Sequence, residues 1–335
     1  MAKTSDKTGT LTTPVATIFA PCLAERSCTI PYNHLFEMKK HEASHTARFV
    51  SNGIYWVSQH GHLACEVPAE LGAYTDAMTC RLELGQGTLR KAIARRLLLM
   101  KSALLQAASM PGIYLYQLLR KRYIESVARA TLGNEVQQVV VIGAGFDTLS
   151  LRLSADMPGY SVIEIDHPAT QRVKKEVLED FSLSRSDVQF VPVDLSQESL
   201  ADTLFETDGY DPRLPTLFIM EGVTMYLDES RVRDLLDCIA SQAPGSKFLF
   251  TYMEESTPGC YDFQNSRAAT RWWLALRNER FTWGVGRSQL SEFLAQSGFR
   301  LLEHRTPEDL RSELLTESNR DAVLAQGENT ALASL

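Results

Sequence analysis

The stretch VVVIGAGFDTLSLRL, residues 139–153, decides the fold that we predict for this chain. Four apolar residues run into a Gly-Ala-Gly turn, and Asp147 follows two residues after the second glycine. An apolar strand that enters a glycine-rich turn ahead of a helix is typical of cofactor binding in an α/β fold. The glycines alone do not say which cofactor the turn holds.

Helices and strands are predicted on both sides of this stretch. Upstream, apolar residues at helical spacing predict a helix at 88–110, and a second helix is predicted at 116–132. Downstream, helices alternate with further strands at 160–166, 187–195, 216–222, 247–252 and 300–305. Because these strands are largely apolar throughout, they indicate a parallel sheet covered on both faces. We therefore expect an α/β, Rossmann-like fold with a seven-stranded, mostly parallel sheet.

The sequence pattern changes along the chain and suggests three parts. Residues 1–87 are irregular and hold five of the seven histidines and four of the six cysteines, and we expect them to form an N-terminal helical cap. Residues 88–310 are expected to form the main domain. Residues 311–335 are expected to be a C-terminal tail with a frayed end.

Composition narrows the function. The net charge of −7 gives no reason to expect a nucleic-acid partner. No stretch of about 18 apolar residues suggests a membrane span. Six cysteines without a C-x-x-C pair are typical of reduced thiols, so a cytoplasmic location is expected.

The residues after the turn favour one cofactor over another. A dinucleotide fold calls for G-x-G-x-x-G, but Thr148 stands at the third glycine position. Asp147 would also compete with a pyrophosphate for the amides at the start of the following helix. S-adenosylmethionine carries no phosphate and has a positive sulfonium and ammonium, so a carboxylate suits it. We expect this cofactor, with a nicotinamide dinucleotide as the rival.

Acidic residues at three later strand ends support a ligand site, because ligands in such sheets bind at the carboxyl ends of the strands. Asp166 follows the second strand and is suited to ribose hydroxyls. Asp194, next to Leu195, is suited to the adenine amino group, although an aspartate there is also a good helix N-cap. Glu221 follows the fourth strand, where a carboxylate is costly without a partner such as the cofactor ammonium or sulfonium.

Four segments together resemble the leucine carboxyl methyltransferase family: 139–153, IEIDHPATQRVKK (163–175), VPVDL (191–195) and FIMEGVTMYL (218–227). The resemblance covers roughly residues 88–305 and implies a class I methyltransferase fold. It implies that Gly143, Gly145 and Asp147 lie beside the methionine part of the cofactor and that Asp166 binds its ribose. Founding members methylate the C-terminal leucine carboxylate of a protein phosphatase, and many bacterial relatives methylate oxygens of small secondary metabolites.

The resemblance also implies roles for residues outside the turn. Asp194 and Leu195 would contact adenine, and Glu221 would complete the cofactor site beside Tyr226. An arginine before the turn would bind the cofactor carboxylate. Arg120 matches that position best. Arg122 lies close by, and Leu149 stands where relatives commonly carry arginine.

Residues 260–284 are the expected cover of the acceptor site. Arg267 and Arg271 lie at i and i+4 and could clamp a carboxylate through two hydrogen bonds. Trp272, Trp273 and Phe281 could form an aromatic wall, although a surface helix packed on the sheet would show the same pattern. Tyr226 could donate a hydrogen bond to the acceptor oxygen or simply line the pocket.

Two other patterns are interpreted as structural. Scattered histidines and cysteines could hold zinc, but their spacing fits no standard site, so no metal is expected. They are Cys22, Cys28, His34, His41, His45, His60, His62 and Cys65. The basic helix at 88–110 is expected to be a solvated face, and His167 is expected to hold its loop.

The sequence therefore predicts an S-adenosylmethionine-dependent O-methyltransferase acting on a carboxylate or hydroxyl of a small metabolite in a biosynthetic pathway. The expected partner is a small-molecule acceptor. The alternatives are methylation of a protein C-terminus and a relative that binds the cofactor without turnover.

Overall fold

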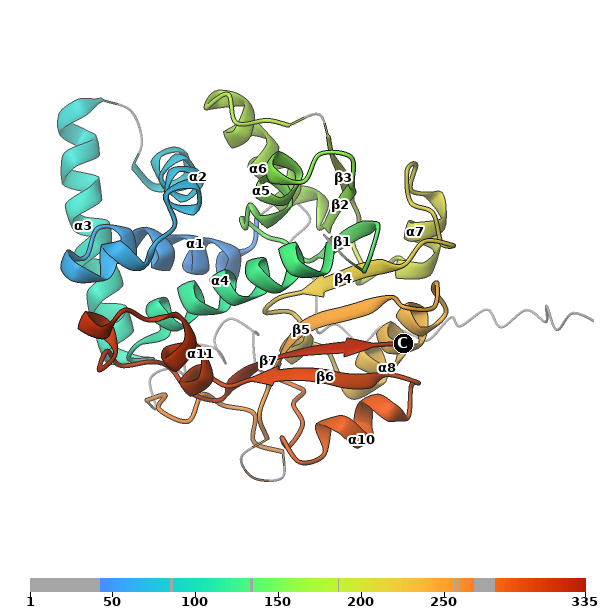
Figure 1. Ribbon diagram of the computed structural model, residues 1–335. Helices are drawn as coiled ribbons and strands as arrows, with labels where there is room; N and C mark the ends of the chain where they lie inside the picture. The colour runs from blue at the N-terminus through green and yellow to red at the C-terminus, as the bar shows by residue number, and fades with distance from the viewer. Residues whose placement is uncertain are drawn as a thin grey trace, which may run out of the picture. The chain divides into compact units, whose positions relative to one another are not determined.

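The computed structural model describes residues 43–84, 87–132, 135–185, 187–255, 257, 259–267 and 281–335. In this part of the chain, one sheet of seven strands has the order β3-β2-β1-β4-β5-β7-β6 (Figure 1). Strands β1 to β5 pair in parallel, and β7 runs antiparallel to both of its neighbours. The prediction of a mostly parallel α/β sheet is confirmed. The strands are β1 (Gln138–Ile142), β2 (Ser161–Asp166), β3 (Val188–Pro192), β4 (Thr216–Met220), β5 (Lys247–Met253), β6 (Arg300–Arg305) and β7 (Glu328–Ser334).

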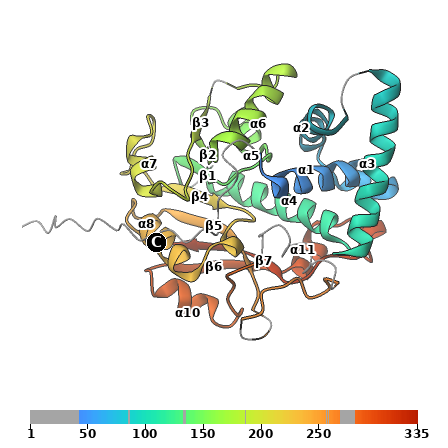
Figure 2. The same ribbon diagram turned by 180° about the vertical axis from the view of Figure 1, so that it is seen from behind.

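Helices cover both faces of the sheet, as the two opposite views show (Figures 1 and 2). Successive strand residues point to opposite faces, so alternate residues of β1 belong to different cores. Val139 and Val141 share a core with α4 (Ile113–Leu132), α5 (Leu149–Asp156), α6 (Pro168–Asp180) and α11 (Pro307–Leu314). Val140 and Ile142 share the other core with α7 (Leu200–Glu206), α8 (Glu229–Ala240) and α10 (Leu290–Ala295).

The elements before α4 join the same compact unit. They are α1 (His45–Ser58), η1 (Gly61–Glu66), α2 (Ala69–Thr79), the π-helical turn η2 (Cys80–Leu84) and α3 (Thr88–Ala108). A Cβ on Gly53 would lie 2.3 Å from Cδ1 of Tyr114, so glycine lets α1 lie directly on α4. Residues 36–335 form one unit, and the expected boundary at 87–88 therefore does not separate two compact parts.

The expectation of a frayed tail at 311–335 is wrong. β7 pairs with β5 along its whole length, from Glu328 opposite Met253 to Ser334 opposite Lys247, and all seven of its residues are buried. Small side chains such as Ala331 fit between the helix layers without giving the strand a strong apolar pattern. The sequence of β7 therefore looks like a tail although it lies inside the sheet.

The helix predicted at 88–110 is confirmed as α3, but its apolar stripe points away from the core. Leu98 and Ser102 are its buried residues. The stripe residues are between 54% and 75% exposed, and they are Leu89, Ile93, Leu97, Met100 and Leu104. Among the helices of the described residues, none is both long and apolar enough to span a membrane.

Candidate active site

The glycine turn lies where β1 ends, beside the ends of β2 and β4. Gly143 and Gly145 have φ angles of +70° and +57°, a region that favours glycine. A Cβ on Gly143 would lie 2.6 Å from Cγ2 of Val223, and one on Gly145 would lie 2.9 Å from Cβ of Ala47. The turn is thus enclosed between α1 and the segment after β4, and both of these positions need glycine.

Asp166 ties the end of β2 to this turn. Its carboxylate accepts hydrogen bonds from the backbone N–H groups of Gly145 and His167. Burial raises the pKa of Asp166, and the two backbone hydrogen bonds partly oppose that rise. His167 accepts a hydrogen bond at Nδ1 from the backbone of Ala169 (3.2 Å) and caps α6, in line with the structural role expected for it.

Asp194 and Leu195 follow β3. The Asp194 carboxylate is 32% exposed, accepts a hydrogen bond from the backbone of Ser196 (3.0 Å) and lies 3.8 Å from Nε2 of His167. Leu195 packs against the core on the α7–α8 face. The adenine contact stays a prediction, because the bond to Ser196 is also what a local turn requires.

Five charged side chains form what we call the ion-pair cluster: Arg120, Lys121, Asp147, Glu221 and Glu328. Arg120 on α4 is buried and contacts Oε1 of Glu221 at 2.8 Å and Oε2 of Glu328 at 2.5 Å. Lys121 contacts Oδ2 of Asp147 at 2.7 Å and Oε1 of Glu221 at 3.0 Å. Three carboxylates face two cations. Arg152 also lies 3.7 Å from Oδ1 of Asp147 but is itself paired with Glu125, so the cluster carries a net charge of −1 when its five groups are ionised. Three of its members, Arg120, Asp147 and Glu221, were predicted site residues.

Asp147 connects the cluster to the start of α5. Its Oδ1 accepts hydrogen bonds from the backbone N–H groups of Thr148 (2.6 Å) and Leu149 (3.2 Å). Burial alone would raise the pKa of Asp147, but the positive charges of Lys121 and Arg152 outweigh burial and hold the pKa below its usual range. Asp147 is therefore ionised at neutral pH and occupies the helix N-terminus, where an anion is favoured.

A second buried ion pair, between Lys174 and Glu164, contacts the segment that follows the turn. Nζ of Lys174 lies 2.6 Å from Oε1 of Glu164, and both side chains are fully buried. Ser150 donates a hydrogen bond to the other oxygen of Glu164, and Lys174 also donates to the carbonyl of Asp147. Burial raises the pKa of Glu164 despite the favourable charge of Lys174. This pair fixes the backbone that presents Asp147.

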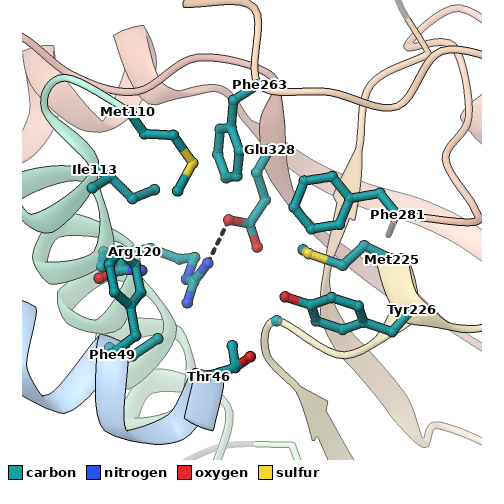
Figure 3. A pocket seen from close by; sticks show the side chains of 13 residues that line it. Thr46, Phe49, Met110, Ile113, Arg120, Met225, Tyr226, Phe263, Phe281 and Glu328 are labelled. Atoms are coloured by element: carbon teal, nitrogen blue, oxygen red, sulfur yellow. Dashed lines mark hydrogen bonds and ion pairs between the residues drawn. The ribbon is translucent and has the colours of Figure 1, made fainter. Parts of the chain in front are cut away.

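A cavity opens beside the ion-pair cluster, between α1, α4 and the segment after β4 (Figure 3). Its volume is about 60 Å³. Gly222, directly after Glu221, and the buried residues Arg120 and Glu328 place it against the cluster. Aromatic and sulfur-containing side chains form most of the rest, and they include Phe49, Met110, Met225, Tyr226, Phe263 and Phe281. Tyr226 and Phe281 thus lie where a pocket wall was expected, with ring centroids 5.6 Å apart.

One half of the predicted arginine clamp, Arg267, does not line this cavity. Arg267 is exposed and is not one of the cavity's lining residues, and its backbone N–H donates to the carbonyl of Ser109 (2.8 Å). Arg271, Trp272 and Trp273 lie outside the described residues.

The alternative arginine, Arg122, takes a structural role. It contacts Oε2 of Glu66 at 2.9 Å, and Glu66 also accepts hydrogen bonds from Thr316 and Asn319 near η4 (Glu317–Asn319). The contact ties α4 to η1, away from the turn. Of the two candidates, Arg120 is the one beside Glu221.

Sequence reasoning missed Lys121 and Glu328. Lys121 lies between two arginines that competed for one role, and consecutive helix residues point in different directions. Glu328 was assigned to the tail. A signal for it did exist, since a lone carboxylate opens the stretch ENTALASL, which is otherwise uncharged.

The histidines and cysteines show no metal site in the described part of the chain, where no three potential ligands gather. His60 stacks on Trp56 with ring centroids 3.9 Å apart, and Cys65 donates a hydrogen bond to the carbonyl of His62 (2.9 Å). Cys22, Cys28, His34 and His41 lie outside the described residues.

The cluster can exchange its internal ion pairs for pairs with a ligand. Its excess negative charge favours a ligand with a net positive charge, and its cations can bind an anionic group of that same ligand. S-adenosylmethionine, with an ammonium, a sulfonium and a carboxylate, has this distribution of charge. The donor set of the site therefore fits the cofactor that the sequence predicts.

Comparisons with known proteins identify a family whose model matches the part of the chain that contains the glycine turn. The model of the leucine carboxyl methyltransferase family matches residues 70–240, just over half of the chain. A protein of Bacillus subtilis (strain 168), described as "Putative S-adenosyl-L-methionine-dependent methyltransferase YktD", is 29% identical over 210 residues. That match covers 62% of this chain and 68% of the relative. A protein of Mycolicibacterium vanbaalenii with the same description, without the name YktD, is 32% identical over 197 residues, covering 58% of this chain and 59% of that protein.

Solved structures share the fold at low sequence identity. A "putative methyltransferase" from Thermobifida fusca YX superposes with a TM-score of 0.52 at 14% identity, covering 80% of this chain and 95% of that one. A DUF574 family protein from Streptomyces avermitilis superposes with a TM-score of 0.51 at 16% identity, covering 88% and 98%. At such identities the similarity shows the fold alone.

Proposed function

Because the chain belongs to the leucine carboxyl methyltransferase family, we propose that it is an S-adenosylmethionine-dependent O-methyltransferase with a small acceptor molecule. The observation that carries the proposal is the ion-pair cluster, whose net charge is −1 and which lies between the glycine turn and the cavity. When bound, the cofactor supplies a methyl group made electrophilic by a positive sulfur.

Each part of the cofactor has a proposed partner. Arg120 would bind its carboxylate, and Asp147 and Glu221 would bind its positive groups. Asp166, at the end of the neighbouring strand, would accept hydrogen bonds from ribose, and Asp194 with Leu195 would face adenine. Apart from Arg120 on α4, these residues lie at or after the carboxyl ends of β1, β2, β3 and β4, which is where open α/β sheets bind ligands.

The chain's own residues contribute orientation and exclusion of water. α1 covers the turn through Ala47, and the aromatic side chains surround the cavity. Burial of this kind strengthens electrostatic interactions and holds an acceptor oxygen in place, and orientation alone is worth effective molarities of roughly 10⁵ M or more. The small cavity supports a small acceptor group, and we place the reaction in a biosynthetic pathway.

Calorimetric titration of the full chain with S-adenosylhomocysteine and, separately, with NADH tests the cofactor. We expect S-adenosylhomocysteine to bind and Asp166→Ala to weaken it at least about tenfold, because a hydrogen bond to a charged group is worth about 1.5–3 kcal/mol. Asp234→Ala, at an exposed aspartate on α8, is the matched control and should bind as the unmodified chain does. Binding of NADH in place of S-adenosylhomocysteine would overturn the proposal.

Turnover is tested separately. The chain is incubated with S-adenosylmethionine and a panel of phenols, alcohols and carboxylic acids, and methylated products are detected by mass spectrometry. Products that carry the methyl group on oxygen are expected. A chain that binds the cofactor but methylates nothing in a broad panel would instead be the non-catalytic relative.

A further inference from the structure

The cavity contains a buried carboxylate oxygen that lacks a hydrogen-bond partner. Glu328, at the first residue of β7, is 1% exposed. Its Oε2 contacts Arg120, whereas its Oε1 has no hydrogen-bond partner in the structure. In Figure 3 this carboxylate points into the space enclosed by the labelled side chains, and the hydroxyl of Tyr226 points into the same space.

From this oxygen we propose that the methyl acceptor is a hydroxyl compound, such as a phenol, whose O–H group binds Oε1 of Glu328. The inference rests on the proposed function, because it names the acceptor class of that same site. It chooses the hydroxyl over the carboxylate that the founding members of the family methylate.

An unpaired oxygen in this position calls for a hydrogen-bond donor. Leaving a buried acceptor unsatisfied is costly, more so when it is charged, and native structures pair nearly all such groups. Gln117, buried on α4, also lines the cavity and has an unpaired side-chain oxygen, Oε1. Oε1 of Gln117 lies next to Gly53 of α1, so the oxygen of Glu328 is the acceptor with which a ligand hydroxyl can pair.

The charges argue against a carboxylate in this cavity. Among the described residues that line it, Arg120 and Glu328 are the charged ones, and Arg120, held between two carboxylates, is the cation proposed for the carboxylate of the cofactor. Lys121 is similarly held between Asp147 and Glu221. A carboxylate ligand would meet the unpaired Oε1 of Glu328 with no further cation, among the described lining residues, to offset the repulsion between like charges.

The aromatic side chains that line the cavity indicate that the hydroxyl belongs to an aromatic ring. Phe281 lies between two other rings, with centroid distances of 5.6 Å to Tyr226 and 5.8 Å to Phe263. Aromatic rings favour packing against a further ring at such distances. A volume of about 60 Å³ is several times the roughly 10–15 Å³ that one water needs, so the cavity admits a hydroxyl and the adjoining edge of a ring. The remainder of the acceptor would extend through the cavity's opening.

Glu328 has a chemical role in this arrangement beyond binding. A phenol or alcohol must lose its proton to become a methyl acceptor, and a positioned carboxylate can take it. The proton would pass from the acceptor oxygen to Oε1 of Glu328, which is the atom that already receives the hydrogen bond. A carboxylate acceptor would need no such base.

A pair of probes that differ only in this group tests the inference. Binding of 4-methylphenol and 4-methylbenzoate to the full chain is measured by ligand-observed NMR titration, with and without saturating S-adenosylhomocysteine. We expect the phenol to bind at least about tenfold more tightly than the benzoate, the effect of roughly one hydrogen bond to a charged group. Glu328→Gln, which removes the charge and adds a donor, should bring the two affinities to within about threefold.

Three controls separate the outcomes. Phe281→Ala removes part of the wall without changing charge, so it should weaken both probes and keep their ratio. Glu292→Gln, at an exposed glutamate on α10, should change neither affinity. Urea unfolding of Glu328→Gln, compared with that of the unmodified chain, shows that this variant is folded.

The inference fails if the benzoate binds as tightly as the phenol, if neither probe binds, or if Glu328→Gln keeps the unmodified preference. Failure of S-adenosylhomocysteine to bind the unmodified chain is a different result, because it overturns the proposed function whatever the probes do.

Discussion

Two buried ionic groups both contact Asp147 after the glycine turn, and they differ in how completely they are paired. In the first group, each carboxylate oxygen of Glu164 has a partner: one contacts Lys174 and the other accepts a hydrogen bond from Ser150. The second group is the ion-pair cluster, which has more carboxylates than cations and in which Oε1 of Glu328 is unpaired. The first group is complete without a ligand, whereas the second has binding capacity left over.

The difference suggests how to separate structural from functional charges in this fold. A pair that satisfies every donor and acceptor stabilises one conformation, and removing one partner leaves a buried charge alone. A cluster with excess charge is less favourable by itself and gains when a ligand supplies the missing charge. Variants of the Glu164–Lys174 pair should therefore affect mainly the free energy of unfolding. Variants of the ion-pair cluster should affect mainly ligand binding.

The largest effect on stability is expected from Lys174→Met. The substitution leaves Glu164 buried without its cation and removes a hydrogen bond to the carbonyl of Asp147. Breaking a buried pair in this way costs about 3–5 kcal/mol. The free energy of unfolding is measured by urea denaturation at pH 7.

Removing the second charge provides the control. The double variant Lys174→Met/Glu164→Leu replaces both partners with apolar residues and should recover much of the loss. A loss of less than about 1 kcal/mol in Lys174→Met would show that the pair is not the structural element described above.

A smaller effect on stability, with a clear effect on binding, is expected from Glu221→Gln. Arg120 keeps Glu328 and Lys121 keeps Asp147, so no charge is left alone. A charged partner of the ligand is lost, and calorimetry should show at least about tenfold weaker binding of S-adenosylhomocysteine. If unfolding were affected as strongly as in Lys174→Met while binding persisted, Glu221 would belong with the structural pair.

The sequence predicted the part of the site that follows local rules. Gly143, Gly145 and Asp166 follow buried apolar strands, and parallel strands bring their carboxyl ends to one edge, so these positions could be inferred from order alone. Asp147 could be inferred too, because an acid at a helix start has a specific electrostatic effect. The positions of β1 to β6 along the chain followed from the same alternation.

The missing part depends on contacts between distant segments. Glu328 reaches Arg120 because β7 inserts between β5 and β6, a pairing that joins residues far apart in the chain. Apart from the lone carboxylate of Glu328, the seven mostly small residues show no pattern that predicts such an insertion. The exposed stripe of α3 is a related case, since helical spacing predicts a helix and says nothing about which face meets the core.

The pH dependence of stability distinguishes Asp147 from Asp166 and Glu164. Its pKa lies below the ordinary value of 3.8 because Lys121 and Arg152 outweigh burial, so the folded state binds the proton less readily than the unfolded chain does. This contribution to stability is present above about pH 4 and is lost as the pH falls further. Asp166 and Glu164 have raised pKa values and contribute in the opposite sense, favouring folding as the pH falls.

Comparison with Asp147→Asn isolates this contribution, since both chains keep Asp166 and Glu164. Urea unfolding between pH 7 and pH 3 should show the unmodified chain losing more stability than the variant, by on the order of 1–2 kcal/mol. Parallel curves would mean that Asp147 has an ordinary pKa, and that Lys121 is engaged mainly by Glu221.

The smallest effect on unfolding is expected from Glu328→Gln, even though Glu328 is as buried as Glu164. The amide keeps the shape of the side chain and an oxygen for Arg120, and the loss of one negative charge brings the cluster to neutrality. Arg120 also retains Glu221 at 2.8 Å. The lost attraction and the relieved excess charge should nearly cancel, so we expect a change of less than about 1 kcal/mol in either direction. A loss near that of Lys174→Met would mean that the negative charge of Glu328 is needed to hold Arg120 in the folded chain, and the distinction between a complete pair and a cluster with capacity for a ligand would no longer hold.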